Sequence, residues 1–200
     1  MKVRYIAIER EYGSGGTKIA QETARRCGLA CYGREILEAV AKEHHLSVEE
    51  LENYEEKVSS SFLYSMFVVS QSQTGDPDLL SGEAKLLVAE ERKIRALAQS
   101  GPAVFVGHSA ADALKDCDGV LRIFSHAEDA SKRSRIIEDY HIPAPQVDAV
   151  CTRVNKRRAN YYSFCTRKKW NDLRNYDIVL DSSRLGIDGC AAALSALYAG

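Results

Sequence analysis

The sequence has no apolar run long enough to cross a membrane. Its opening stretch, MKVRYIAIER, holds too short an apolar run for a signal peptide, and no later run approaches the roughly 18 apolar residues of a membrane span. Internal repeats and low-complexity segments are also missing. We therefore expect a cytoplasmic protein with no membrane partner.

Paired cysteines and a one-sided charge are absent as well. The six cysteines are Cys27, Cys31, Cys117, Cys151, Cys165 and Cys190. They form no C-x-x-C pair, so we interpret them as reduced, small apolar residues and not as disulfides or zinc ligands. The formal net charge is −1, with 45% hydrophobic residues, so neither disorder nor a nucleic-acid-binding surface is expected. At 200 residues the chain is long enough for one sizeable core.

The sequence does contain a glycine-dense turn between an apolar run and a helical pattern, within VRYIAIEREYGSGGTKIA at 3–20. The run at 3–8 is nearly continuously apolar, as in a strand with helices on both faces. From Ile19 to Cys27 the apolar residues repeat at helical spacing, and Gly28 can end the helix. Glycines between the two let backbone N–H groups converge on an anion at a helix N-terminus. We predict a phosphate-binding loop formed by Gly13, Ser14, Gly15, Gly16 and Thr17.

The loop does not match the Walker A pattern GxxxxGK[ST], because the lysine of that pattern is missing. If Gly15 takes the place of the last glycine, Gly16 occupies the lysine position. Thr17 then stands at the hydroxyl position, and Lys18 comes one residue late. Successive helical residues point about 100° apart, which puts the reach of Lys18 toward a bound phosphate in question. A glycine-rich turn without a ligand is the alternative interpretation.

The rest of the chain alternates helical and strand patterns. Helices are expected at 34–45, 81–100, 110–115, 128–140, 146–163 and 187–198, and strands at 103–107, 120–124 and 176–182. This alternation, with a glycine loop after the first strand, predicts an α/β fold with a parallel sheet covered on both faces. A dinucleotide-binding Rossmann site is disfavoured because G-S-G-G lacks the G-x-G-x-x-G spacing.

Residues 59–78, SSSFLYSMFVVSQSQTGDPD, differ in composition from their surroundings. They combine hydroxyl, aromatic and Met side chains with a turn cluster at their end. This pattern fits a buried helical segment, or else a mobile substrate flap or a dimer surface. The sequence therefore leaves a homo-oligomer open.

Six stretches together resemble the cytidylate kinase-like family. They are REYGSGG (10–16), SSFLYS (60–65), the strand ending in VGH (106–108), KRRANYY (156–162), RKKW (167–170) and NYDIVLDSSRLGIDG (175–189). Each stretch alone is only weakly specific for the family, but the order and spacing of all six together are more specific. The resemblance spans nearly the whole chain and implies a three-layer α/β/α P-loop kinase-like fold in a single domain, residues 1–200. It also implies an acceptor-side helical region at about 45–80 and a lid-like basic segment at about 145–170.

The resemblance also implies a reaction. Relatives among the nucleoside monophosphate kinases transfer the γ-phosphoryl group of ATP to CMP or a similar monophosphate, using Mg²⁺. We therefore expect ATP and Mg²⁺ as cofactors and a small-molecule nucleotide, CMP-like, as the acceptor. The alternative is a nucleotide-binding sensor or regulatory module with little or no kinase activity, which the missing lysine favours.

The chain departs from true cytidylate kinases at three positions. Those kinases carry a lysine where Gly16 stands, and an arginine and then an aspartate where His108 and Ser109 stand. Phosphoryl transfer depends on positioning and on neutralising phosphate charge, so other cations must take over. Arg10 and Lys18 flank the loop and are the first candidates.

The basic segment 153–169 supplies further candidates. It lies where kinases of this kind keep an arginine-bearing lid, and a solvated helix face is the alternative. Together with Arg10 and Lys18, we take Arg153 and Arg158 of this segment as the catalytic candidates.

Metal binding is expected at the hydroxyl position of the loop. Thr17 is the predicted Mg²⁺ contact, with phosphate oxygens and water completing the coordination. Glu9 and Asp112 are the nearest acidic candidates. His108 either contacts a phosphate or is a packed, hydrogen-bonded residue.

Overall fold

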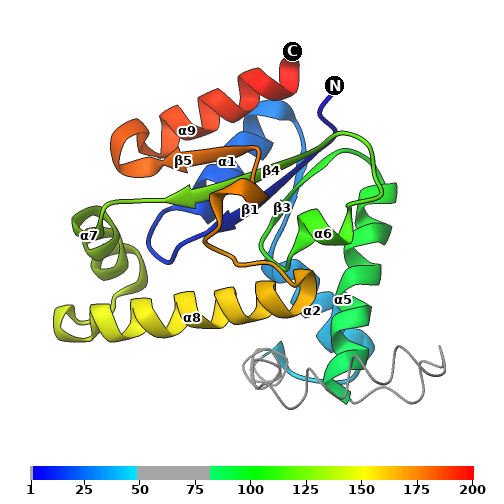
Figure 1. Ribbon diagram of the computed structural model, residues 1–200, viewed down its shortest axis with the longest axis horizontal. Coiled ribbons are helices and arrows are strands. Elements are labelled where there is room, and N and C mark those ends of the chain that lie inside the picture. Colours follow the sequence, from blue (N-terminus) through cyan, green and yellow to red (C-terminus); the bar gives the residue numbers. More distant parts are fainter. Residues whose placement is uncertain (1, 49–81) are drawn as a thin grey trace.

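The computed structural model describes residues 2–48 and 82–200. Its strands are β1 (Tyr5–Arg10), β2 (Ala30–Tyr32), β3 (Ala103–Val106), β4 (Val120–His126) and β5 (Ile178–Asp181). Within the described residues these strands form one parallel sheet in the order β2-β3-β1-β4-β5 (Figure 1). The first strand therefore lies at the centre of the sheet, with its carboxyl end between those of β3 and β4.

Helices follow the strands along the chain. They are α1 (Gly16–Cys27), α2 (Arg34–Glu43), α5 (Gly82–Gln99), α6 (Ala110–Ala113), α7 (Asp129–Tyr140), α8 (Val147–Thr166) and α9 (Ser182–Ala199). Short 3₁₀ helices lie at Ala144–Gln146 and Leu173–Asn175. The last helix starts earlier than its apolar pattern indicates, because the turns on both sides of Gly186 are helical while Gly186 itself (φ 69°, ψ 169°) is not.

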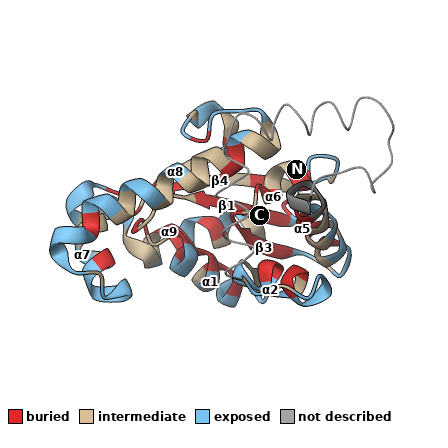
Figure 2. Ribbon diagram, turned by 90° about the horizontal axis from the view of Figure 1, so that it is seen from below, coloured by how far each residue is buried: buried red, intermediate tan, exposed pale blue. Residues whose placement is uncertain are grey.

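Two helical layers cover the sheet, as the alternation along β1 requires. Ile6 and Ile8 point to the layer of α1 and α9, whereas Tyr5 and Ala7 point to the layer of α2, α5 and α6. Figure 2 shows the central strands β1, β3 and β4 as largely buried, while α7 is mostly exposed. The predicted three-layer α/β/α fold is confirmed.

Helix α8 joins the end of the sheet through an aromatic cluster. Phe124 of β4 packs with Tyr162 of α8, Trp170 and Tyr176. This packing fixes the C-terminal half of α8, while its N-terminal half continues past the phosphate loop toward α7 (Figure 1).

Part of the predicted organisation lies outside the described residues. This applies to most of the acceptor-side region at about 45–80 and to the alternatives for 59–78. Among the residues that are described, no helix is both long and apolar enough to cross a membrane.

Candidate active site

The predicted phosphate loop connects the central strand β1 to helix α1. Gly13 and Gly15 have φ values of 78° and 75°, in the left-handed region that glycine adopts without strain. A Cβ on Gly13 would lie 2.8 Å from the backbone oxygen of Lys132, and one on Gly15 would overlap the side chain of Ile187. Helices α7 and α9 therefore press against the loop and hold its backbone in place.

The start of α1 presents backbone donors. The helix begins at Gly16, and its N-cap residue Gly15 has no side chain with which to cap it. The N–H groups of residues 16–18 consequently have no acceptor inside the helix. Thr17 lies on this first turn and is exposed. The dipole of α1 and these N–H groups together favour an anion at this position.

Ser14 ties the loop to the neighbouring strand ends. It is fully buried. The hydroxyl of Ser182 donates to its carbonyl oxygen at 2.6 Å, and the hydroxyl of Ser125 donates to its Oγ at 3.3 Å. The predicted loop residues are thus brought together, with Ser14 as the internal anchor and Thr17 on the open side.

Two cations of α7 lie beside the loop, and the sequence did not single out either of them. Lys132 Nζ lies 3.0 Å from the Glu11 carboxylate. Arg135 donates to the carbonyl oxygen of Gly13 at 3.3 Å and to the hydroxyl of Ser182 at 2.8 Å. Their three-residue spacing puts both cations on one face of a helix, but no sequence pattern indicates that this face meets the loop.

Arg10 and Lys18 flank the loop in sequence but point to different sides of it. Lys18 Nζ forms an ion pair with Asp139 of α7 at 2.7 Å, and its side chain is 54% exposed. Arg10 packs against the loop: a Cβ on Gly16 would lie only 2.5 Å from Arg10 Cβ. The Arg10 guanidinium reaches the backbone of Gly107, at the end of β3. The structure thus separates these two predicted cations.

Beyond Arg10 lies a cavity of about 240 Å³ that we call the arginine pocket. It is lined by Glu9, Arg10, Arg34, Leu37, His108, Arg157, Arg158 and Tyr161. The four arginines come from β1, α2 and α8, and among these lining residues only Glu9 is acidic. Such an excess of guanidinium groups favours a doubly charged anion.

Arg158 connects the arginine pocket to the phosphate loop. Its Nη1 donates to the carbonyl oxygen of Arg10 at 3.0 Å, and its guanidinium carbon lies 5.7 Å from the centroid of the Tyr12 ring. The backbone N–H of Tyr12 in turn donates to Oδ1 of Asn155 on α8 at 2.7 Å. Burial, followed by the charge of Arg10, lowers the pKa of Arg158. An anion in the pocket would stabilise this poorly solvated cation.

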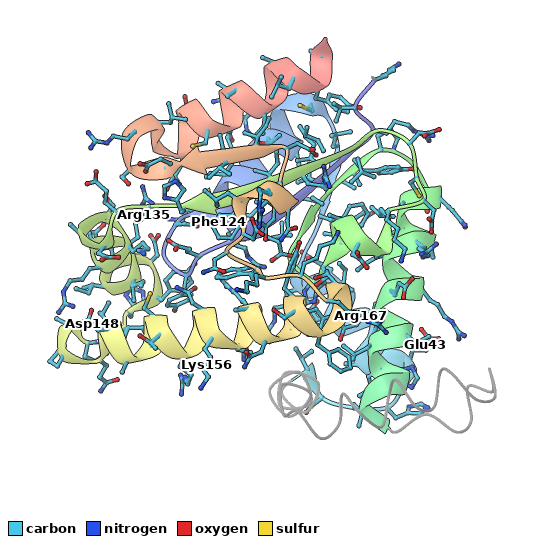
Figure 3. All side chains as sticks on the ribbon, in the orientation of Figure 1. Glu43, Phe124, Arg135, Asp148, Lys156 and Arg167 are labelled. Carbon is cyan, nitrogen blue, oxygen red and sulfur yellow. The ribbon has the colours of Figure 1, made fainter. Side chains whose placement is uncertain are left out.

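Several other cations of the predicted lid face outward. Arg153 and Lys156 are exposed on α8, and Figure 3 shows Lys156 pointing away from the sheet. Arg157 lines the arginine pocket next to Arg158. The predicted catalytic residues are therefore divided: Arg10 and Arg158 meet at the pocket, while Lys18 and Arg153 lie outside it. Arg34, at the start of α2, was not predicted, because a lone arginine in a helical pattern gives no signal.

Two buried carboxylates adjoin the arginine pocket. Glu9 is 7% exposed and accepts a hydrogen bond from Trp170 Nε1 at 3.1 Å. Glu90 on α5 is 1% exposed, accepts a hydrogen bond from the Tyr161 hydroxyl at 2.6 Å, and lies 3.4 Å from His108 Nδ1. His108 therefore contacts a carboxylate on one side and lines the pocket on the other.

A second cavity, of about 100 Å³, shares His108 and Tyr161 with the arginine pocket; we call it the side cavity. Its walls include apolar Leu87, Val88, Ala113 and Phe164, together with Ser109 and Asp112. Asp112 thus belongs to the side cavity. In the described part of the chain, no three His, Cys, Asp or Glu side chains are grouped so that they could hold a metal ion.

Comparison with known proteins identifies the family to which this geometry belongs. The sequence profile of the cytidylate kinase-like family matches residues 5–184. The chain belongs to this family. The resemblance inferred from the six sequence stretches is therefore confirmed. A search of curated proteins finds no match.

Solved structures share the fold at low sequence identity. An uncharacterised protein from Eubacterium ventriosum is 21% identical, with a TM-score of 0.73 over 100% of this chain and 99% of that chain. Shikimate kinase from Bacteroides thetaiotaomicron is 14% identical, with a TM-score of 0.57 over 98% of each chain. TT1252 from Thermus thermophilus is 18% identical, with a TM-score of 0.55 over 100% and 98%. These likenesses establish a P-loop kinase-like fold.

Proposed function

We propose that this protein transfers the γ-phosphoryl group of ATP to a nucleoside monophosphate in the cytoplasm, with a CMP-like acceptor. One observation carries the proposal: the arginine pocket lies directly beside the phosphate loop, with Arg10 and Arg158 at the boundary. In-line transfer requires two anions held next to each other, and their repulsion must be offset by cations. Arg10 and Arg158 would supply these cations for the phosphoryl group as it passes from donor to acceptor.

The donor triphosphate would bind on the loop at Gly13–Thr17 with Mg²⁺. This metal needs few protein ligands, because phosphate oxygens and water complete its octahedral shell. An exposed hydroxyl on the first turn of α1, that of Thr17, suits such a site. When bound, the metal would neutralise charge on the β- and γ-phosphates. Glu9, buried in β1, is a carboxylate candidate for an outer contact through water.

The acceptor would place its phosphate in the arginine pocket and its base in the side cavity. The small volume of the side cavity, about 100 Å³, favours a pyrimidine over a purine. The hydroxyl of Ser109 is buried there and has no hydrogen-bond partner among the described residues, so it is available to a base. Asp112 lines the same cavity and can accept from an exocyclic amino group.

Lys18 and Arg153 form the outer part of the proposed catalytic set. Both lie outside the arginine pocket, so Arg153 would contribute only when the lid segment at about 145–170 closes, and Lys18 only when it leaves Asp139. We propose that this lid and the acceptor-side region at about 45–80 belong to one domain, residues 1–200.

A sensing module without transfer activity is the second candidate. The observation that favours it is the loop itself, which has a glycine at the lysine position and a neighbouring Lys132 whose charge is offset by Glu11 and Asp129. Such a module would bind ATP and change its lid contacts without forming ADP.

The test is an acceptor panel with labelled ATP and Mg²⁺, comprising CMP, UMP, AMP, free nucleosides and small alcohols. We expect ADP formation that depends on CMP or a close analogue. Arg34→Ala should raise the acceptor KM by about 10- to 100-fold and leave the KM for ATP unchanged, since a charge-assisted bond is worth about 1.5–3 kcal/mol. Lys42→Ala, which removes an exposed cation from the same helix, is the matched control.

Three results would contradict the proposal or part of it. Tight ATP binding without transfer to any acceptor would establish the sensing module. Efficient transfer to an uncharged alcohol would remove the anion from the role assigned to the arginine pocket. If Arg34→Ala and Lys42→Ala raised the acceptor KM equally, the pocket arginines would act only through the net charge of the protein.

A further inference from the structure

The lysine of the Walker A pattern has no space in this loop. A Cβ on Gly16 would lie 2.5 Å from Arg10 Cβ and 2.9 Å from Arg10 Cγ. Carbon atoms in contact are normally about 3.5–4.0 Å apart, so any side chain at this position displaces Arg10. A cation for the triphosphate must therefore come from another element.

The two lysines beside the loop are already paired with carboxylates. Lys18 Nζ lies 2.7 Å from Asp139 and is half exposed. Lys132 Nζ lies 3.0 Å from Glu11 and 2.8 Å from Asp129. Their charges are largely neutralised, and a phosphate would have to compete with these carboxylates for them.

Arg135 is the cation of α7 that touches the loop backbone. Its Nη1 donates to the carbonyl oxygen of Gly13 at 3.3 Å and to the hydroxyl of Ser182 at 2.8 Å. Its Nη2 donates to the carbonyl oxygen of Ser182 at 3.0 Å. The Nη1 atom also lies 3.8 Å from the Cβ position of Gly15. Figure 3 shows Arg135 on the side of α7 that faces the sheet.

The charge of Arg135 remains uncompensated. All its hydrogen-bond acceptors are neutral, and no carboxylate of the described residues forms an ion pair with it. A guanidinium has five N–H donors, so two remain after these three bonds, on Nε and Nη2. Ser182 also donates to the carbonyl oxygen of Ser14 at 2.6 Å, so the guanidinium is held rigidly against the loop.

We propose that Arg135 supplies the positive charge at the β- and γ-phosphates that the lysine of a Walker A loop supplies. The cation then reaches the triphosphate from α7, across the loop, and not from the first turn of α1. A preorganised cation beside the backbone donors stabilises phosphate charge without reorganisation. This inference rests on the proposed ATP site in the loop.

The test compares Arg135→Gln, Arg135→Lys and Arg133→Gln by calorimetry. The ligands are inorganic triphosphate, ATP and adenosine. We expect Arg135→Gln to weaken triphosphate and ATP binding by about 10- to 100-fold, the range for hydrogen bonds to charged groups, with adenosine affected less than about 3-fold. Arg135→Lys should recover most of the loss, because it keeps the charge. Arg133→Gln, on the same helix but paired with Asp148, should match the wild type.

These readouts separate the electrostatic role from a purely structural one. If Arg135 only anchored the loop, Arg135→Gln would weaken adenosine and triphosphate binding alike, and Arg135→Lys would not restore the triphosphate. Wild-type affinity for triphosphate in the folded Arg135→Gln variant would also overturn the inference. A wild-type protein that binds triphosphate but transfers nothing would contradict the proposed kinase activity alone. A wild-type protein that binds no triphosphate would overturn both.

Discussion

The phosphate loop and the arginine pocket lie side by side but are built from different chemical groups. The loop presents the backbone N–H groups of residues 16–18, with one internal serine and glycines packed tightly against α7, α9 and Arg10. The pocket is a surface of side chains, in which four guanidinium groups from three elements surround a cavity of about 240 Å³. If both regions bind anions as proposed, the loop does so mainly through the shape of its backbone, with one cation added from α7, and the pocket does so through the charge of its side chains.

Because the two regions are built differently, different kinds of substitution should abolish ligand binding in each. A loop whose glycines have no free space loses its ligand when atoms are added, because the backbone has to move. A pocket of cations loses function when charge is removed, because the shape of the cavity survives while the anion loses its partners. Three substitutions test this contrast, and they are ordered from the largest expected effect to the smallest.

The largest effect is expected from restoring the Walker A lysine. Gly16→Lys should lower ATP affinity by about 100-fold or more, although it adds the consensus residue, because its Cβ would collide with the Arg10 stem and displace the loop. Calorimetry with ATP and a melting curve would measure affinity and stability separately. A gain in ATP affinity would show that the loop adapts, and the contrast between shape and charge would fail.

Gly28→Ala is the matched control for this steric argument. Gly28 ends α1 with φ 65°, and a Cβ there would meet no atom within 4 Å. The substitution should cost about 1 kcal/mol of stability, because alanine is strained in this conformation. ATP affinity should not change, since the end of α1 at Gly28 is far along the helix from the loop.

Sequence patterns sufficed for the fold and for the loop because both depend on local residues. The apolar run of β1, the glycines after it and the helical spacing of α1 lie within residues 3–20, so one stretch defines strand, turn and helix. The order of the strands in the sheet is not local. It was not predicted; the family resemblance implied a three-layer architecture, which the structure confirms.

The second-largest effect is expected from removing a positive charge at the boundary between the phosphate loop and the arginine pocket. Arg158→Ala should lower kcat by about 30- to 1,000-fold with little change in ATP affinity, since contacts made mainly in the transition state are worth about 2–4 kcal/mol. Burial lowers the pKa of Arg158, and an anion beside this cation would stabilise its charged form. Steady-state kinetics with calorimetry on the same variant would separate kcat from binding.

Arg153→Ala is the companion variant on the outer face of α8. Arg153 is exposed, so its loss should reduce kcat much less than the loss of Arg158 if α8 keeps its position during turnover. A reduction of equal size would show that the lid rotates and brings Arg153 onto the transferring phosphate. Unchanged kcat in Arg158→Ala would remove the lid from the mechanism.

Several side chains of the site could not be assigned from sequence because they reach it only through tertiary packing. Arg135 and Glu90 each lie in a helical pattern where a charged residue normally faces solvent, and Arg34 is in fact exposed, so the pattern marks none of them. Glu90 is instead buried against Tyr161, and Arg135 is held against the loop. Conversely, Lys18 lies next to the loop in sequence but points to Asp139, because adjacent residues on a helix diverge by about 100°.

The smallest effect is expected from substituting Lys18. This substitution tests whether a cation that is next to the loop in sequence contributes to ATP binding. Lys18 points to Asp139 in a partly exposed ion pair, and pairs near the surface contribute roughly 0–1 kcal/mol. Lys18→Ala should therefore change ATP affinity by less than about 3-fold, and the Arg10→Ala, Lys18→Ala double variant should behave like Arg10→Ala alone. Asp139→Asn is the informative control, because it removes the carboxylate partner of Lys18 and keeps the positive charge of the lysine. If Asp139→Asn strengthens ATP binding and the double variant loses more than Arg10→Ala, then Lys18 reaches the phosphate once it is released. In that case a second cation, besides Arg135, would act on a phosphate in the loop.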